Sequence, residues 1–220
     1  MDHQHTLQLN GSGAPSYMCS GCKEIGFGSS YICAKSSCNY IVHKECAEPV
    51  KHAVHPFFKD SKFEFCEKAE EGAFCDACGK DLLGFFYSSK KQGFLSLFSR
   101  TGYSLHPCCL NLEKNISDKM TLSHQVPSDC TKCKQRHVAK NNFEGWSYVV
   151  DSDGKTCVHV SCFNDMILEN LNNNKSKGRM RSFMKFTGKL VVNVLIDIAL
   201  GDITNSISII TEALVSGFCE

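Results

Sequence analysis

Cysteine and histidine recur in this 220-residue sequence at spacings that suit metal binding. Three times, at intervals of about 55 residues, a Cys-x-x-Cys pair is followed some 20–27 residues later by His-x-x-Cys. The quartets are Cys19, Cys22, His43 and Cys46 (site 1), Cys75, Cys78, His106 and Cys109 (site 2), and Cys130, Cys133, His159 and Cys162 (site 3). Three thiolates and one imidazole at this spacing are typical of a closed tetrahedral zinc site. Three quartets in register predict a tandem repeat in which zinc replaces much of the hydrophobic core.

The residues around the ligands repeat as well. An apolar residue precedes each histidine, at Val42, Leu105 and Val158, and a cysteine follows three residues after it. This spacing predicts that both ligands lie on one side of a short turn or at the start of a helix. The sequence therefore repeats a local structure along with its ligand types.

The first repeat contains more ligands than one zinc ion needs. Cys33 and Cys38 form a second pair, and His5 and His52 lie on either side of the repeat. We expect His5, Cys33, Cys38 and His52 to form a second tetrahedral site (site 4), with His55 as the alternative to His52 as the last ligand.

The composition sets limits on the fold and the compartment. Modules of about 50 residues rarely bury enough apolar surface to fold without a metal or disulfides. The N-terminal residues lack a basic start and an apolar segment, so we expect no secretory signal, reduced cysteines and a location in the cytoplasm and/or nucleus. No stretch predicts a transmembrane helix. Glycine-punctuated apolar stretches at 25–32 and 82–87 predict short strands, and helical periodicity is weak before about residue 160.

The order of ligands and their flanks resembles the divergent C-one domain, a cysteine- and histidine-rich zinc finger of plant proteins that is related to the diacylglycerol-binding domain of protein kinase C. The matching segments are His5-Thr-Leu, Cys19-Ser-Gly-Cys22, Tyr31-Ile-Cys33, Tyr40-Ile-Val-His43-Lys-Glu-Cys46-Ala-Glu-Pro49, His52-Ala-Val-His55-Pro56, Phe74-Cys-Asp-Ala-Cys-Gly79 and Leu105-His-Pro-Cys-Cys109. The resemblance implies a zinc-binding protein with a signalling or stress-response role. It does not imply diacylglycerol binding, because divergent members generally lack the full lipid-binding pattern.

The later repeats depart from that pattern. In the second repeat, Ser88 and Ser89 occupy the place where the family usually has a ligand cysteine, and serine is a poor zinc ligand. In the third repeat only Cys157 and His124 remain as candidates for a second site. We therefore expect about four zinc ions, two in the first module and one in each of the others.

Two other classes of protein could also use cysteines and histidines at these spacings. A plant-homeodomain finger, which reads histone tails, would use a cross-brace in which Cys75 and Cys78 join Cys33 and Cys38. That assignment leaves His106 and Cys109 without partners and breaks the threefold repeat. An enzyme is disfavoured because a catalytic zinc keeps an open position, whereas each complete site here has four protein ligands. We expect no enzymatic activity and no small-molecule substrate.

A basic run beside the third Cys-x-x-Cys pair leaves nucleic-acid binding open. It consists of Lys132, Lys134, Arg136, His137 and Lys140, with Phe143, Trp146 and Tyr148 close behind. Basic and aromatic residues in alternation suit single-stranded nucleic acid. The formal net charge of +1 argues against a generally basic nucleic-acid binder, and we favour a solvated loop followed by aromatic core residues.

The last part of the sequence has a different composition. Six basic residues without an intervening acid lie between Lys175 and Lys189, and an apolar stretch follows at 190–200. This pattern predicts a helical segment that packs on a module or a protein partner, or one that lies on an anionic membrane surface. The candidate contact residues are Lys185, Lys189, Leu190 and Val194.

These observations together predict small zinc-stabilised β-rich (α+β) modules in tandem, followed by a C-terminal apolar helical segment. The expected boundaries are 1–54 for the module with two zinc sites, 55–122 and 123–170 for the modules with one site each, and 171–220 for the basic linker and helical tail. The expected function is that of a non-enzymatic zinc-binding adaptor with a protein partner. An anionic membrane or a nucleic acid is the alternative partner.

Overall fold

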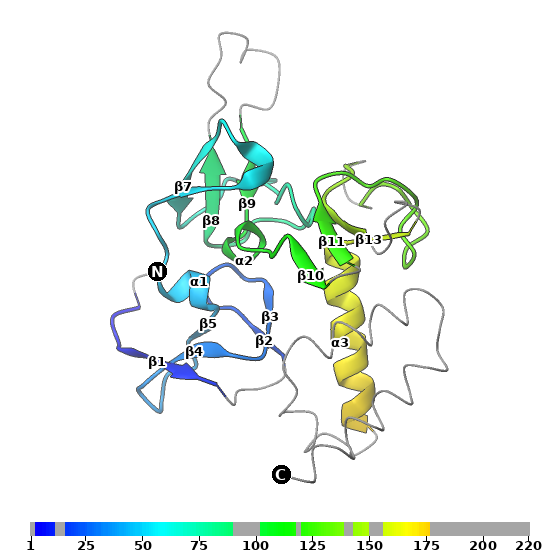
Figure 1. Cartoon of the computed structure of the whole chain (residues 1–220). Coiled ribbons are helices and arrows are strands. Elements are labelled where there is room, and N and C mark those ends of the chain that lie inside the picture. Colours follow the sequence, from blue (N-terminus) through cyan, green and yellow to red (C-terminus); the bar gives the residue numbers. More distant parts are fainter. Residues whose placement is uncertain are drawn as a thin grey trace. The chain divides into compact units, whose positions relative to one another are not determined.

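The computed structural model describes residues 3–11, 16–89, 102–117, 120–138, 143–149 and 156–176. The chain divides into two compact units, Met1–Leu112 and Glu113–Glu220 (Figure 1). The predicted helical tail, with Lys185, Lys189, Leu190 and Val194, lies outside the described residues. Among the helices that are described, none combines the length and apolar character needed to cross a membrane.

The first module consists of short strands around two loops that carry ligands. One antiparallel sheet has the strand order β1-β4-β5, and β2 pairs with β3 in a separate hairpin. The elements are β1 (Leu7–Asn10), β2 (Ser16–Met18), β3 (Ile25–Phe27), β4 (Ser30–Cys33), β5 (Ile41–Val42) and the one-turn helix α1 (Lys44–Ala47). The apolar stretch at 25–32 thus contains two strands, and Gly28 (φ 71°) lies in the turn between them.

The second module is a four-stranded antiparallel sheet in the order β6-β7-β8-β9. Its elements are β6 (His52–Val54), the 3-10 helix η1 (Pro56–Phe58), β7 (Lys62–Cys66), β8 (Phe86–Ser89), β9 (Ser104–Leu105) and the short helix α2 (Pro107–Leu110). The strand that we expected at 82–87 begins at Phe86.

The third module repeats this arrangement in the second unit. Its antiparallel sheet has the order β10-β11-β12-β13. The elements are β10 (Asn115–Ser117), β11 (Met120–Ser123), β12 (Ser147–Val149), β13 (Cys157–His159) and the helix α3 (Val160–Ser176).

A common three-stranded sheet underlies all three modules. It consists of β1-β4-β5 in the first module, β7-β8-β9 in the second and β11-β12-β13 in the third. In each module the last of these strands leads into the ligand histidine. The registers agree, since Tyr31, Tyr87 and Tyr148 occupy equivalent positions opposite the apolar residue that precedes the histidine. That apolar residue, Val42, Leu105 or Val158, is fully buried. The repeat in the sequence is therefore a repeat of structure.

The module boundaries differ from those we expected at residues 54 and 122. Strand β6 pairs with β7, so residues 52–54 belong to the sheet of the second module. Strands β10 and β11 pair with β12, so residues 115–123 belong to the third. The first difference arises from the added edge strand β6, and the second arises because the added strand β10 and the first strand of the common sheet, β11, both begin before residue 123. Such pairing depends on contacts between strands.

His55 stabilises the start of the second module. Its side chain is buried, and its Nδ1 accepts the Phe57 N–H at 3.1 Å, which caps the 3-10 helix η1. Its ring also packs against Phe57 and Phe58, with ring centroids 4.9 and 6.0 Å away. Burial lowers the pKa of His55, which favours the neutral ring that can accept this hydrogen bond.

We predict that His55→Ala lowers the free energy of unfolding by about 1–3 kcal/mol, because it removes a buried hydrogen bond and leaves a cavity. His55→Asn, which keeps a cap acceptor, should lose less. Urea unfolding at neutral pH in excess zinc measures both changes. Equal losses in the two variants would show that the cap does not contribute.

Candidate metal centres

Four groups of cysteine and histidine bring their ligand atoms within 4.8 Å of one another. Three of these groups are the quartets of sites 1, 2 and 3. The fourth consists of His3, His5, Cys33 and Cys38. Each group is thus able to hold one zinc ion, and the described part of the chain has two such groups in the first module and one in each of the others.

A tight turn shapes each Cys-x-x-Cys pair. The residue after the second cysteine has a left-handed backbone, with φ of 66° at Lys23, 72° at Gly79 and 59° at Lys134. Its N–H donates to the carbonyl of the first cysteine at 3.0, 2.9 and 2.8 Å in the three turns. The same turn therefore presents two sulfur atoms to one side in all three modules.

The His-x-x-Cys half of each site lies at the start of a helix. His43, His106 and His159 immediately precede α1, α2 and α3, and the cysteine three residues later lies in the first turn. In α1 and α2 the cysteine N–H donates to the histidine carbonyl at 3.1 and 3.0 Å. The sequence spacing predicted this arrangement, and the structure confirms it.

The imidazoles are oriented for metal binding through Nδ1. The Nδ1 atoms of His43, His106 and His159 lie 3.3, 3.4 and 3.4 Å from a sulfur atom of the second cysteine in the preceding pair. Their Nε2 atoms face backbone carbonyls, those of Ile25, Asp81 and Arg136, at 3.3, 3.3 and 3.2 Å. An Nε2–H that donates to a carbonyl leaves the Nδ1 lone pair free for a metal, because a metal-binding histidine usually donates its other ring N–H to a neighbouring acceptor.

The charge balance of the sites also suits a cation. Burial raises the pKa of the Cys75 thiol, but hydrogen bonds from the other site 2 ligands outweigh it and hold that pKa well below its usual value. Burial opposes protonation of His106, yet the hydrogen bond and charge of Cys75 raise its pKa to about 12. In site 3 a hydrogen bond from Cys162 is the main cause that lowers the pKa of Cys130 to about 2. The pKa values of other thiols in these quartets are raised, chiefly by a hydrogen bond to Cys108 for Cys109 and by one to Cys130 for Cys162. A divalent cation would displace the protons that remain on these thiols and on His106 Nδ1.

The donor sets therefore fit zinc. Sites 1, 2 and 3 would hold it with three sulfur atoms and one imidazole nitrogen, and the first-module group with two of each. Zinc held by four protein ligands contributes folding free energy, because unfolding would separate the ligands. Ligands are also held by the backbone, since the N–H groups of His106 and His159 donate to Cys75 and Cys130 sulfur atoms at 3.4 and 3.5 Å.

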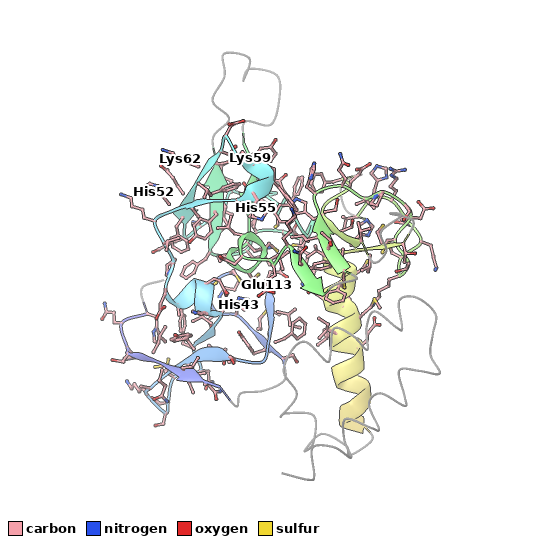
Figure 2. The ribbon with its side chains drawn as sticks, viewed as in Figure 1. His43, His52, His55, Lys59, Lys62 and Glu113 are labelled. Carbon is pink, nitrogen blue, oxygen red and sulfur yellow. The ribbon has the colours of Figure 1, made fainter. Side chains whose placement is uncertain are left out.

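Site 4 differs from our expectation at one ligand. His3 takes the place that we assigned to His52, and its Nε2 lies 3.4 Å from the Cys38 sulfur. The His3 ring stacks on Tyr40 with the ring centroids 4.0 Å apart. His52 belongs to the second module because it lies in strand β6 and is the register partner of Glu64 in strand β7. Figure 2 shows His52 near Lys62 on that sheet, whereas His43 of site 1 lies next to α1.

The second module has serine where a further site would need ligands. Ser89 takes the register position of Cys33, since Phe63 pairs with Ser89 as Leu7 pairs with Cys33. The Ser89 hydroxyl accepts the Tyr103 N–H at 3.2 Å. In the third module, Cys157 is buried and donates to the Ser128 carbonyl at 3.1 Å, and neither it nor His124 belongs to one of the four groups.

The cross-brace of a plant-homeodomain finger is not formed. Cys75 and Cys78 lie with His106 and Cys109, whereas Cys33 and Cys38 lie with the two N-terminal histidines. The ligands of each metal group therefore come from a single module. A histone-reading finger would instead need a metal site whose ligands come from two successive modules.

The basic run of the third module is partly neutralised. Lys132 forms an ion pair with Glu169 at 2.6 Å, and Arg136 lies 3.8 Å from Glu144. Trp146 and Tyr148 are 2% and 3% exposed, so neither offers a ring face for base stacking. Both aromatic residues belong to the core, as we favoured.

We predict that Lys134→Gly stabilises the protein by roughly 0.5–1 kcal/mol, because glycine adopts a left-handed backbone without the penalty of a Cβ. Gly79→Ala, at the equivalent turn of site 2, should destabilise it by a similar or larger amount. Thermal unfolding in excess zinc measures both. A loss of stability in Lys134→Gly would contradict the shared turn geometry.

Metal analysis of the protein purified without chelator should give about four zinc ions per chain. His3→Ala should lower this number by about one, whereas His52→Ala should leave it unchanged, because only His3 lies with the Cys33–Cys38 pair. The opposite result for the two variants would restore His52 as the ligand.

Comparison with known proteins finds a similarity in the first module. No curated protein and no solved structure matches the chain. Residues 2–47 match the family model described as the C1 domain. The matched segment contains every ligand of sites 1 and 4 as the structure groups them, and it ends before His52. The first module is therefore similar to a C1 domain, and the modules after it carry the Cys/His groups typical of zinc fingers.

Proposed function

We propose that this protein is a non-enzymatic adaptor whose zinc-stabilised modules bind a protein partner, in the signalling or stress-response setting that the resemblance implies. The observation that carries the proposal is the closure of the metal groups. Each of the four groups in the described segments already has four protein donors. A zinc-binding interaction module fits both these groups and the C1 domain.

The closed groups support a structural role for zinc. A catalytic zinc needs a coordination position for water or substrate, and a fourth protein ligand occupies that position. The imidazoles of sites 1 to 3 are held through Nε2 by backbone carbonyls, so they are poorly placed to transfer protons to another molecule. Burial of the site 1 and site 2 ligands further supports a stabilising metal.

The choice of partner rests on the chemistry of the modules. C1 domains bind diacylglycerol-containing membranes or proteins. The ion pairs of Lys132 and Arg136 and the buried ring of Trp146 speak against a nucleic acid at the third module. No cysteine in the described segments is in a disulfide, and most lie in the metal groups, which supports a reducing compartment such as the cytoplasm or nucleus.

A three-way binding experiment tests the proposal. Zinc-loaded full-length protein is presented with cell extract, with phosphatidylserine vesicles with and without diacylglycerol, and with single-stranded oligonucleotides. We expect specific recovery of a protein that is lost when site 3 is disrupted by Cys130→Ser and retained in the surface variant Lys68→Ala. Binding to vesicles or oligonucleotides alone would contradict the adaptor role, as would a turnover activity that depends on the same cysteines.

Any attraction to anionic membranes should reside in the basic tail. Each basic residue near an anionic surface contributes about 1 kcal/mol, which salt screens. We predict that removal of residues 177–220, which leaves α3 intact, abolishes sedimentation with phosphatidylserine vesicles at low salt. Lys185→Glu with Lys189→Glu should weaken it at least tenfold, whereas Lys134→Glu in the third module should not. Sedimentation that persists without the tail would place the contact on the modules.

A further inference from the structure

The first and second modules meet at the Cys-x-x-Cys turn of site 1. The Phe85 N–H donates to the Gly21 carbonyl at 3.1 Å. The approach is so close that a Cβ on Gly84 would collide with the Gly21 carbonyl oxygen, and a Cβ on Gly21 would lie 2.7 Å from the Phe85 ring. Two glycines thus allow the backbone of one module to pack directly on the metal-binding turn of the other.

Side chains of the second module complete the core around site 1. Phe85 and Cys108 pack against the buried cluster that contains Cys19, Cys22 and Cys46. Cys108 immediately precedes Cys109, a ligand of site 2. Residues next to one metal group therefore contribute to the surroundings of the other.

Glu24 lies at the centre of this contact. Its backbone is held by the site 1 turn, because the Cys19 N–H donates to the Glu24 carbonyl at 2.9 Å. Its carboxylate reaches into the second module, where one oxygen lies 3.8 Å from His106 Nε2 and the other 3.5 Å from Lys80 Nζ. The Glu24 side chain is only 13% exposed, so water screens these interactions weakly.

We infer that Glu24 is a positioning residue for site 2 and makes zinc binding there depend on the fold of the first module. His106 Nε2 already faces the Asp81 carbonyl at 3.3 Å, and the carboxylate adds a negative charge on the same side of the ring. A negative charge at Nε2–H strengthens Nδ1 as a metal donor and fixes the ring orientation. Among the described residues, no carboxylate forms an ion pair with the Nε2 atom of His43 or His159, as Glu24 does with that of His106.

The arrangement couples the two sites. Zinc at site 1 fixes the Cys19–Cys22 turn that holds the Glu24 backbone, so it also holds the carboxylate that faces His106. Binding free energies are reciprocal, and zinc at site 2 must favour site 1 to the same extent. The inference is independent of the adaptor proposal, because it concerns the metal groups alone.

The test uses the full-length, zinc-loaded protein with selectively labelled histidines. Glu24→Gln keeps the side-chain shape and removes the charge. We expect it to raise the dissociation constant of site 2 for zinc about 10–100-fold, as measured by chelator competition, because loss of such a supporting group typically costs this much. Imidazole nitrogen resonances should change for His106 and remain unchanged for His159 of the other unit.

Two control variants separate charge from packing. Glu71→Gln removes an exposed carboxylate from the second module and should leave all four sites unaffected. Lys80→Met removes the other ion-pair partner but keeps Glu24, so site 2 should retain its affinity within about threefold. An unchanged site 2 in Glu24→Gln would overturn the inference. An equal loss in Lys80→Met would overturn it too, because the effect would then come from packing at the interface.

Discussion

The structure depends on one physical requirement. In sites 1, 2 and 3, three sulfur atoms and one imidazole nitrogen must lie close enough together to bind the same ion. Short modules have little apolar core of their own, and their most buried residues are the ligands and the apolar side chains beside them. The requirement is met by a turn with a left-handed residue and by a histidine placed just before a helix. Everything between these two halves can vary in length, as the three loops do.

Much of the metal-binding arrangement was readable from spacing alone. The Cys-x-x-Cys and His-x-x-Cys pairs are local motifs whose geometry is set by neighbouring residues, and the three quartets form as predicted. The last ligand of site 4 was not readable in this way. His3 and His52 both flank the Cys33–Cys38 pair in the sequence, and the choice between them is made by the pairing of His52 with Glu64. Strand pairing of this kind is a tertiary effect that periodicity does not reveal.

The contact between the first and second modules could not be predicted from the sequence either. Glu24 is one of 23 acidic residues, and nothing near it in the sequence indicates that its carboxylate lies beside a histidine about 80 residues away. Gly21 and Gly84 also look like ordinary turn residues until the two backbones are seen to touch. Repeats that fold around their own metal can be recognised individually, but the surfaces by which they join are specified by scattered residues.

The position of site 3 has a consequence for the long helix that follows it. Helix α3 begins at Val160, directly after the ligand His159, and the ligand Cys162 lies in its first turn. Forming the first turn is the unfavourable step in building a helix, because several residues are fixed for one hydrogen bond. A metal that fixes both ends of this turn acts as the nucleus from which the remaining turns extend to Ser176. Release of the ion would therefore allow the helix to fray from its beginning, so metal occupancy at one end would control the order of a segment about 25 Å long.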